Sequence, residues 1–516
     1  MLVDNNLGVT SRTDVVVVGA GPTGLALACG LLAAGVPVHV FDWAAGPAGT
    51  SRALGLQPRG AEVIDRLGAL GDLPERSIEI RQVAVHINGR HAASLRVGQR
   101  TTLVTRAGLL LSQAEIEAQL RHRLADLGGR VEWGAGVVNV EQDARGVTVE
   151  LGGGATTRSE WIVGCDGAHS AVRKAASIGF PGVPLVERFL LADVHADLPI
   201  PRDTVSVWLQ GAGLIGAFPL PGEDLWRLMA PAPEDGAPEG GAPGSRGDGE
   251  TVALLARVLE ERSGLAAASV RDAEWTSRFR FHRRLAETYR RGRILLAGDA
   301  AHIHSPFGGQ GMNTGLGDAE NLAWKLALVA TGRAQPALLD TYEAERRPIA
   351  TGVLATTSSM TGLILGDTTL ARLVRDHAVV PLLNRPRIQR LIWEQTSQLK
   401  INYRRGPLGQ GARIPGTRGP RPGDRIPDLA CRHADGRHTR LHAELGSRWA
   451  LLGPGKSDAC AAVARRHLGE HGVTVLAPSG DPAREVLLVR PDGHLGWRGG
   501  PAPDGLDRWL SEILGR

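Results

Sequence analysis

The sequence predicts an α/β protein of several domains, centred on a parallel sheet. Val15 to Val18 form an uninterrupted run of β-branched residues, typical of a strand buried on both faces. A glycine-rich turn, a helix-forming stretch over residues 25–34 and a second apolar strand, Val36 to Phe41, follow. This alternation indicates a parallel βαβ unit. A chain of 516 residues is too long for one hydrophobic core, so we expect about two to four domains.

The turn between the two strands has the spacing of a dinucleotide-binding site. Gly19 permits the sharp turn, Gly21 lets the backbone approach a pyrophosphate, and Gly24 allows the helix to pack closely on the strand. The helix start would offer free N–H groups and its positive dipole end to phosphates. Asp42 ends the second strand, where an acid accepts a hydrogen bond from a ribose hydroxyl. The alternative is that the glycines only punctuate a turn, but the complete pattern with its terminal acid favours dinucleotide binding.

Composition excludes several classes of function. The 59 Lys and Arg against 54 Asp and Glu give a net charge of only +5, and the Arg residues form no basic stripe, so we expect no nucleic-acid partner. The N-terminus has no apolar signal segment and no window is apolar enough to cross a membrane, which predicts a cytoplasmic protein without a membrane partner. His302 and His304 lack further ligands, so we expect no metal. Four widely spaced cysteines without C-x-x-C indicate free thiols: Cys29, Cys165, Cys431 and Cys460.

The middle of the chain changes character. Residues 179–285 carry short alternating segments and read as an antiparallel sheet inserted into a domain made of residues 1–178 and 286–405. Residues 81–105, with a hairpin signal at Asn88-Gly89, are expected to add strands to that sheet. A Pro/Gly/Arg-rich linker over 406–424 leads to a small α/β unit over 425–516. Aromatic residues in such a sheet are more often core than ligand contacts. Those that remain candidates for a substrate pocket are Trp208, Phe218 and Trp226.

Two further stretches place acids and glycines after buried strands. Asp166-Gly167 follows an apolar strand and precedes a short helix, where the aspartate could simply cap the helix. Gly298-Asp299 ends another strand and leads through a glycine-dense loop to a helix that we expect over Gly317 to Thr331. Such a loop at a helix start suits close approach to an anionic or electron-rich ring.

These three motifs, in this order, resemble those of the FAD-dependent aromatic hydroxylases, typified by para-hydroxybenzoate hydroxylase. The stretches 422–428 and 488–493 resemble the C-terminal thioredoxin-like domain of bacterial aromatic polyketide hydroxylases and rifampicin-type monooxygenases. The resemblance covers the chain from about residue 13 onward. It implies an α/β fold with a Rossmann-like FAD-binding domain, an inserted antiparallel β-sheet substrate domain and a C-terminal thioredoxin-like domain.

The resemblance also implies roles for individual residues. Gly19, Gly21 and Gly24, with Pro22 and Thr23 between them, would hold the FAD pyrophosphate, and Asp42 would hold the adenosine ribose. Arg52 matches an arginine near the pyrophosphate that in some members meets the nicotinamide cofactor, and Gln113 matches a glutamine on the flavin chain. Asp166-Gly167 is associated with FAD and NADPH, and Asp299 with the ribityl hydroxyls. The residues that would line the isoalloxazine are Pro306, Gly309, Gly311, Met312 and Asn313.

The sequence departs from the family at two places. Ser305 and Phe307 stand where many relatives have Pro and Ala, so Phe307 could narrow the substrate pocket. The tail lacks C-x-x-C, which argues against a dithiol redox role.

The implied activity is hydroxylation of a polycyclic, polyketide-type aromatic substrate. NADPH or NADH would reduce FAD, O₂ would add at C4a, and the hydroperoxide would transfer one oxygen. The nicotinamide cofactor needs no second G-x-G-x-x-G unit in this family. No general base can be named, and the protein is expected to be a monomer or homodimer.

Baeyer–Villiger oxidation or quinone epoxidation shares the same chemistry and stays open. A halogenase is disfavoured because W-x-W-x-I-P is absent, and a dehydrogenase would leave two motifs unexplained. A non-catalytic flavoprotein that sequesters a drug or metabolite is the remaining alternative.

Overall fold

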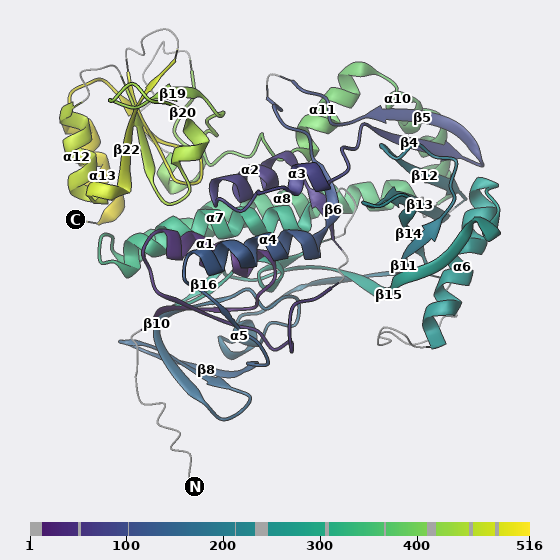
Figure 1. Ribbon diagram of the computed structural model, residues 1–516, viewed down its shortest axis with the longest axis horizontal. Coiled ribbons are helices and arrows are strands. Elements are labelled where there is room, and N and C mark those ends of the chain that lie inside the picture. Colours follow the sequence, from purple (N-terminus) through teal and green to yellow (C-terminus); the bar gives the residue numbers. More distant parts are fainter. Residues whose placement is uncertain are drawn as a thin grey trace.

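A computed structural model describes most of the chain (Figure 1). The described residues are 13–49, 53–101, 103–211, 213–232, 246–304, 309–365, 368–409, 419–453, 458–479 and 485–515. Within them, no helix is both long and apolar enough to span a bilayer.

The central sheet is mainly parallel and runs in the order β16-β17-β10-β1-β2-β7. β1 lies between β2 and β10, so Val15 to Val18 have neighbours on both edges and are buried on both faces. The hairpin of β8 and β9 extends the sheet antiparallel to β10. The strands are β1 (Thr13–Val18), β2 (Val38–Phe41), β7 (Val131–Glu132), β8 (Val137–Asp143), β9 (Gly146–Leu151), β10 (Thr156–Gly164), β16 (Arg290–Arg291) and β17 (Ile294–Leu296).

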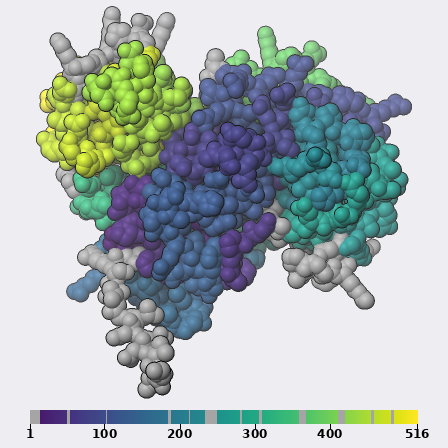
Figure 2. Space-filling view, viewed as in Figure 1, coloured from purple at the N-terminus to yellow at the C-terminus, as the bar shows by residue number. Residues whose placement is uncertain are grey.

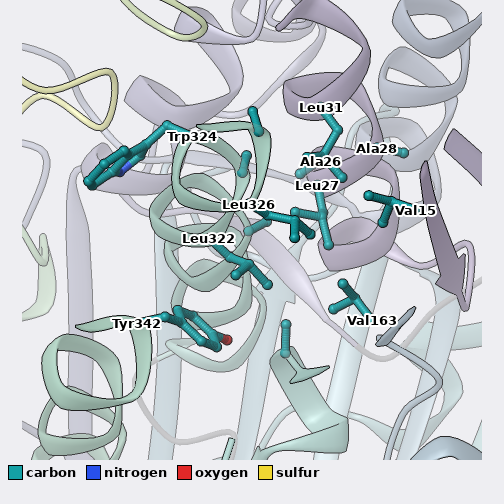
Figure 3. Close-up of a cluster of buried hydrophobic side chains, with 14 of the residues drawn as sticks. Val15, Ala26, Leu27, Ala28, Leu31, Val163, Leu322, Trp324, Leu326 and Tyr342 are labelled. Carbon is teal, nitrogen blue, oxygen red and sulfur yellow. The ribbon is translucent and has the colours of Figure 1, made fainter. Parts of the chain in front are cut away.

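Helices α1 (Pro22–Ala33) and α7 (Gly311–Ala330) pack together against this sheet (Figure 3). Pro22 begins α1, where its missing N–H costs nothing. A Cβ atom on Gly30 would lie 2.8 Å from the Cβ of Ala323, so the glycine lets the two helices approach closely. Leu27, Leu31, Leu322 and Leu326 fill the space between them and belong to the largest hydrophobic cluster.

The second large sheet is mostly antiparallel, in the order β18-β15-β11-β14-β13-β12-β4-β5. Helix α6 (Arg246–Ser263) covers one face of it, at the right of Figure 1. The expected hairpin at Asn88-Gly89 is confirmed: both residues have positive φ, 49° and 75°. Its first strand, β4, pairs in parallel with β12, which comes from much later in the chain. The strands are β4 (Gln82–Ile87), β5 (Arg90–Arg96), β11 (Gly182–Ala196), β12 (Thr204–Gln210), β13 (Gly213–Pro219), β14 (Leu225–Pro231), β15 (Val270–Leu285) and β18 (His302–Ile303).

The C-terminal residues form a separate lobe, coloured yellow-green in Figure 2. Its sheet has the order β20-β19-β22-β21-β23-β24, and helices α12 (Asp458–Leu468) and α13 (Asp504–Leu514) pack on each other beside it. The sequence missed the short strands β19, β20 and β24, whose hydrophobic pattern is weak. The strands are β19 (Ala430–Arg432), β20 (His438–Arg440), β21 (Trp449–Leu452), β22 (Val473–Pro478), β23 (Val486–Val489) and β24 (Leu495–Gly499).

The remaining elements connect these layers. On the large domain they are β3 (Leu54–Leu56), which pairs with β6 (Leu109–Ser112), and the helices α2 (Pro58–Arg66), α3 (Leu73–Arg76), α4 (Gln113–Asp126), α5 (Ala171–Ala175), α8 (Asp340–Leu365), α9 (Thr369–Val374), α10 (Val380–Leu382) and α11 (Pro386–Thr396).

For one helix the sequence predicts the wrong first residue. α7 begins at Gly311 rather than at Gly317, so Gly311 to Asn313 belong to its first turn and not to the preceding loop. The glycines misled the prediction because they have low helix propensity. Here tertiary packing overrides that propensity: a Cβ atom on Gly315 would lie 2.3 Å from the Oγ1 of Thr23, and one on Gly317 would lie 2.9 Å from Arg346.

Candidate active site

Three sequence motifs meet at the carboxyl edge of the parallel sheet. Val18 is in register with Gly164, and Gly164 with Leu296. Backbone hydrogen bonds continue past the strand ends, from Gly19 N to Phe41 O at 2.7 Å and from Cys165 N to Val18 O at 2.7 Å. Parallel strands end together, so the turn after β1, Asp166 after β10 and Asp299 after β17 lie side by side.

The first turn is built for close backbone approach. Gly19 has φ of +104°, and a Cβ atom there would lie 2.4 Å from the carbonyl oxygen of Cys165. At Gly21, by contrast, nothing lies within 4 Å of the position that a Cβ atom would take. The open space faces the start of α1, whose first N–H groups have no partner within the helix. This is the environment that a pyrophosphate requires.

The Gly298-Asp299 turn is pressed onto the same helix start. Gly298 has φ of +61°, and a Cβ atom there would lie 2.6 Å from the Oγ1 of Thr23. Asp299 is exposed, although Gly298 and Ala300 beside it are buried. The protein atoms that crowd the Asp299 carboxyl raise its pKa by desolvation, His302 opposes this effect, and Asp318 adds to it. An exposed carboxyl at the end of a parallel strand is available to a hydroxyl-bearing ligand.

Asp42 is held at the end of β2 by backbone amides. Its Oδ2 accepts from Ala20 N at 2.7 Å and its Oδ1 from Ala44 N at 2.8 Å, so the carboxylate is anchored against the glycine turn. Each oxygen keeps a second lone pair for a ribose hydroxyl. Nearby, Gln113 Nε2 donates to Glu117 Oε1 at 2.7 Å. Burial raises the pKa of Glu117, as does the negative charge of Asp42.

Asp166 caps the helix that follows it. Its Oδ2 accepts from Val172 N at 3.1 Å, while Ser170 provides the N-cap of α5 and accepts from Arg173 N at 2.9 Å. Burial raises the pKa of Asp166, against these local hydrogen bonds. Asp166 therefore both bonds to the start of α5 and lies beside the glycine turn that follows β1. Gly167, which follows it, has φ of +75°.

Asn313 fixes the loop that the resemblance assigns to the flavin ring. Its Nδ2 donates to Gly309 O at 3.0 Å, and its Oδ1 accepts from Gln57 N at 2.9 Å. A Cβ atom on Gly60 would lie 2.0 Å from this Oδ1, so a glycine is needed in α2. Met312 is half-buried against the main core. Arg52, Pro306 and Phe307 lie outside the described residues.

A buried group behind Gly298 escaped the sequence analysis. Asp318 Oδ2 accepts from Gly298 N at 3.1 Å and contacts His302 Nε2 at 2.6 Å. Its Oδ1 accepts from Arg346 Nε at 2.7 Å. Burial opposes the charge of Asp318, but His302 and Arg346 outweigh it and lower its pKa. The available signal was the composition of α7, in which Asp318, Glu320 and Lys325 stand among mostly apolar and small residues.

Two of the aromatic pocket candidates are core residues. Trp208 and Trp226 pack with Leu255 and Leu259 of α6, and Trp226 is only 1% exposed. This position corrects their assignment to a substrate pocket. Both side chains face α6, and only the alternate strand positions face the other side of the sheet. Phe218 alternates with Ala217, which faces α6, and lies half-buried on the other face.

Comparison with known families agrees with this geometry. Residues 12–357 match the family model described as "FAD binding domain", and residues 419–516 match "Aromatic-ring hydroxylase, C-terminal". The chain belongs to the FAD-dependent aromatic hydroxylases. The protein therefore binds FAD, and the resemblance and α/β fold class inferred from its sequence are confirmed.

The relatives of this chain include several named monooxygenases. It is 35% identical to "6-methylpretetramide 4-monooxygenase" of Streptomyces rimosus, over 94% of this chain and 90% of the relative. Among solved structures it is similar to the anhydrotetracycline hydroxylase OxyS of Streptomyces rimosus (33% identity, TM-score 0.77, 98% and 99% of the chains). It is also similar to an aklavinone-11 hydroxylase solved with FAD and aklavinone (25% identity, TM-score 0.77, 98% and 99%). The protein is a FAD-dependent monooxygenase.

Proposed function

We propose that the protein inserts one oxygen atom from O₂ into a polycyclic aromatic, polyketide-type substrate, with NADPH or NADH as electron donor. The relatives named above act on tetracycline-type compounds or were solved with aklavinone. Reduced FAD supplies the oxygen-activating chemistry when bound. The residues of this chain bind the cofactor, orient the substrate and exclude water from the reacting atoms.

The observation that carries the substrate class is an apolar, aromatic face of the large sheet. Opposite the face that α6 covers, side chains from three adjacent strands form one cluster. Its partly buried members, Met229 and Trp275, pack on the buried Phe189, Leu191 and Phe279. Flat aromatic and thioether side chains form the kind of wall on which a fused-ring substrate packs.

This face begins beside the candidate cofactor site. β18, which is His302–Ile303, pairs with the end of β15, so the sheet starts directly after Asp299. The same face carries a buried polar pair, in which Arg227 Nε and Nη2 donate to Asp193 at 2.6 and 2.7 Å. Polar groups set into an apolar wall are what orient a hydroxylated ring system. We therefore propose residues 179–285, with the strands of 81–105, as the substrate domain.

We propose that FAD lies along the carboxyl edge of the parallel sheet, from Asp42 to α7. Gly21 leaves room for the pyrophosphate, and Asp42 and Asp299 offer carboxylates to ribose and ribityl hydroxyls. The N-terminus of α7 would place positive dipole charge near the flavin ring. Such fixed donors stabilise negative charge on a reduced ring.

The test is aerobic NADPH oxidation by the purified holoprotein, with and without a panel of polycyclic phenols and quinones. We expect NADPH consumption to accelerate with one class of compound and to give a product heavier by one oxygen. Product structure then separates ring hydroxylation from Baeyer–Villiger insertion or epoxidation. Substrate binding without any oxygenated product would overturn the proposal in favour of a sequestering flavoprotein.

A further inference from the structure

A loop of the C-terminal domain inserts charged side chains between α7 and α8. Arg490 donates to both carboxylate oxygens of Glu345, at 2.7 and 2.8 Å, and Lys325 Nζ reaches the same carboxylate at 2.8 Å. The side chains of all three residues are at most 1% exposed. Arg490 also binds Asp492 two residues along the loop. Charges this deeply buried are tolerated only where every partner is in place.

The same loop contacts α7 and α2 through Asp492. Its Oδ2 accepts from Asn321 Nδ2 and Trp324 Nε1, both at 3.3 Å. Its backbone oxygen accepts from Arg59 Nη2 at 2.9 Å. Arg59 in turn donates to Glu320 of α7 at 2.7 Å. The tail thus binds α7, whose first turn carries Asn313, and α2, whose N-cap residue is its partner Gln57.

A second path runs from the loop toward the Gly298-Asp299 turn. The ring of His494 lies against that of Tyr403, with centroids 4.3 Å apart. The Tyr403 hydroxyl accepts from Arg346 Nη1 at 3.0 Å. Arg346 Nη2 donates to Thr314 O at 2.9 Å, in the first turns of α7. Arg346 therefore lies between the tail and the loop that the resemblance assigns to the flavin.

The path ends on the backbone of the candidate cofactor site. Arg346 Nε donates to Asp318 Oδ1 at 2.7 Å, and Asp318 Oδ2 accepts from Gly298 N at 3.1 Å. Gly298 precedes Asp299 directly. A continuous series of short contacts thus connects His494 in the tail with the turn that presents Asp299.

We propose that the loop Arg490–His494 is a positioning element for the FAD site, which acts through Tyr403, Arg346 and Asp318 on the Gly298-Asp299 turn. The inference rests on the FAD placement given under Proposed function. Stability alone does not require such an arrangement, because apolar side chains of similar volume usually stabilise a fold as much as buried ion pairs do. Directional hydrogen bonds on a backbone amide give geometric specificity that apolar packing does not.

The decisive variant is Tyr403→Phe, which removes one buried hydroxyl from the path. Apoprotein is titrated with FAD, and flavin fluorescence and visible absorption are recorded without substrate or NADPH. We expect FAD to bind about threefold to tenfold more weakly, with a shifted flavin absorption band. The matched control is Tyr289→Phe. Tyr289 is also buried, but its hydroxyl has no hydrogen-bond partner among the described residues, so its removal should change neither quantity.

Asp492→Asn tests whether the tail is the origin of the effect. If Asp492 and Tyr403 act through one path, the double variant should weaken FAD binding by less than the product of the two single effects. The control within the tail is Asp507→Asn, because Asp507 pairs only with the tail residues Arg466 and His467 in the described structure and should leave FAD affinity unchanged. If Asp492→Asn does not fold, Tyr403→Phe still decides.

Two results would overturn the inference. One is a Tyr403→Phe protein with unchanged FAD affinity and flavin spectrum, whatever its melting temperature. The other is a double variant whose effects multiply, which would show that the two residues act independently. Failure of the proposed function is distinguishable, because an unaltered protein that binds FAD but oxygenates nothing leaves these FAD measurements intact.

Discussion

Gly24 lies so close to the carbonyl oxygen of Gly19 that a Cβ atom built on it would sit 1.9 Å from that oxygen. Helix α1 and the turn that precedes it therefore touch through backbone atoms alone. Gly21, between them, meets nothing within 4 Å. Two glycines of one motif thus differ: Gly24 permits the fold, and Gly21 faces open space, where we propose that the pyrophosphate lies.

We predict that Gly24→Ala and Gly21→Ala separate these purposes. Gly24→Ala should destabilise the protein by about 1–3 kcal/mol and reduce its flavin content, because backbone atoms must shift. Gly21→Ala should keep the melting temperature of the apoprotein but weaken FAD binding. Differential scanning fluorimetry and the flavin-to-protein absorbance ratio measure both. Equal melting temperatures for the two apoproteins would contradict the assignment.

Trp226 and Phe218 should respond differently to truncation. Trp226→Ala removes a fully buried side chain between the sheet and α6 and should cost about 3–5 kcal/mol of unfolding free energy. Phe218→Ala, on the half-buried opposite face, should cost clearly less. Urea denaturation of both variants gives the comparison. A Trp226→Ala protein as stable as Phe218→Ala would contradict the placement of Trp226 in the core and reopen its assignment to the substrate pocket.

Acid should weaken the attachment of the tail. Burial opposes the charge of Glu345, but Arg490 and Lys325 outweigh it and lower its pKa from 4.5 to about 2. A carboxylate whose folded pKa is depressed contributes stability above its unfolded pKa and loses it as pH falls toward the folded value. Glu345 should therefore contribute about 3 kcal/mol that disappears between pH 4.5 and 2.

Urea unfolding at a series of pH values measures this contribution. Glu345→Gln should be less stable at pH 7 and should show a shallower decline below pH 4.5. Because the pKa values of Asp318 and Asp492 are lowered too, the variant should keep part of the decline. An identical pH dependence in both proteins would rule out the role of Glu345.

The four thiols should be unreactive in the native protein. Burial raises the pKa of Cys29 to about 12, against a small opposing effect of Arg123, and that of Cys431 to about 11. Burial also raises the pKa values of Cys165 and Cys460. At pH 8 a disulfide reagent should find almost no thiolate until denaturant exposes all four cysteines. Rapid modification of one native cysteine would identify a thiol that is more exposed or more acidic than the structure indicates.

Local signals in the chain were sufficient for much of the fold. The run Val15 to Val18 and the hairpin at Asn88-Gly89 were predictable because burial on both faces and positive φ each select particular residue types. The strands around Trp208, Phe218 and Trp226 were recognised from their alternation. Which face each aromatic occupies was not, because alternation alone does not say which side of a sheet a helix will cover.

The sequence by itself determined the family and the cofactor class, and it predicted the motifs that we propose surround the cofactor, since a backbone that approaches a pyrophosphate requires glycines at a given spacing. Only the tertiary structure decided that α7 begins at Gly311, and that Asn313 bonds to the loop and to α2. It alone decided that a loop of the tail reaches Arg346 through Tyr403. The physical reason is that a buried charge takes its partner from whichever segment packing brings within about 3 Å, and sequence separation places no limit on that choice.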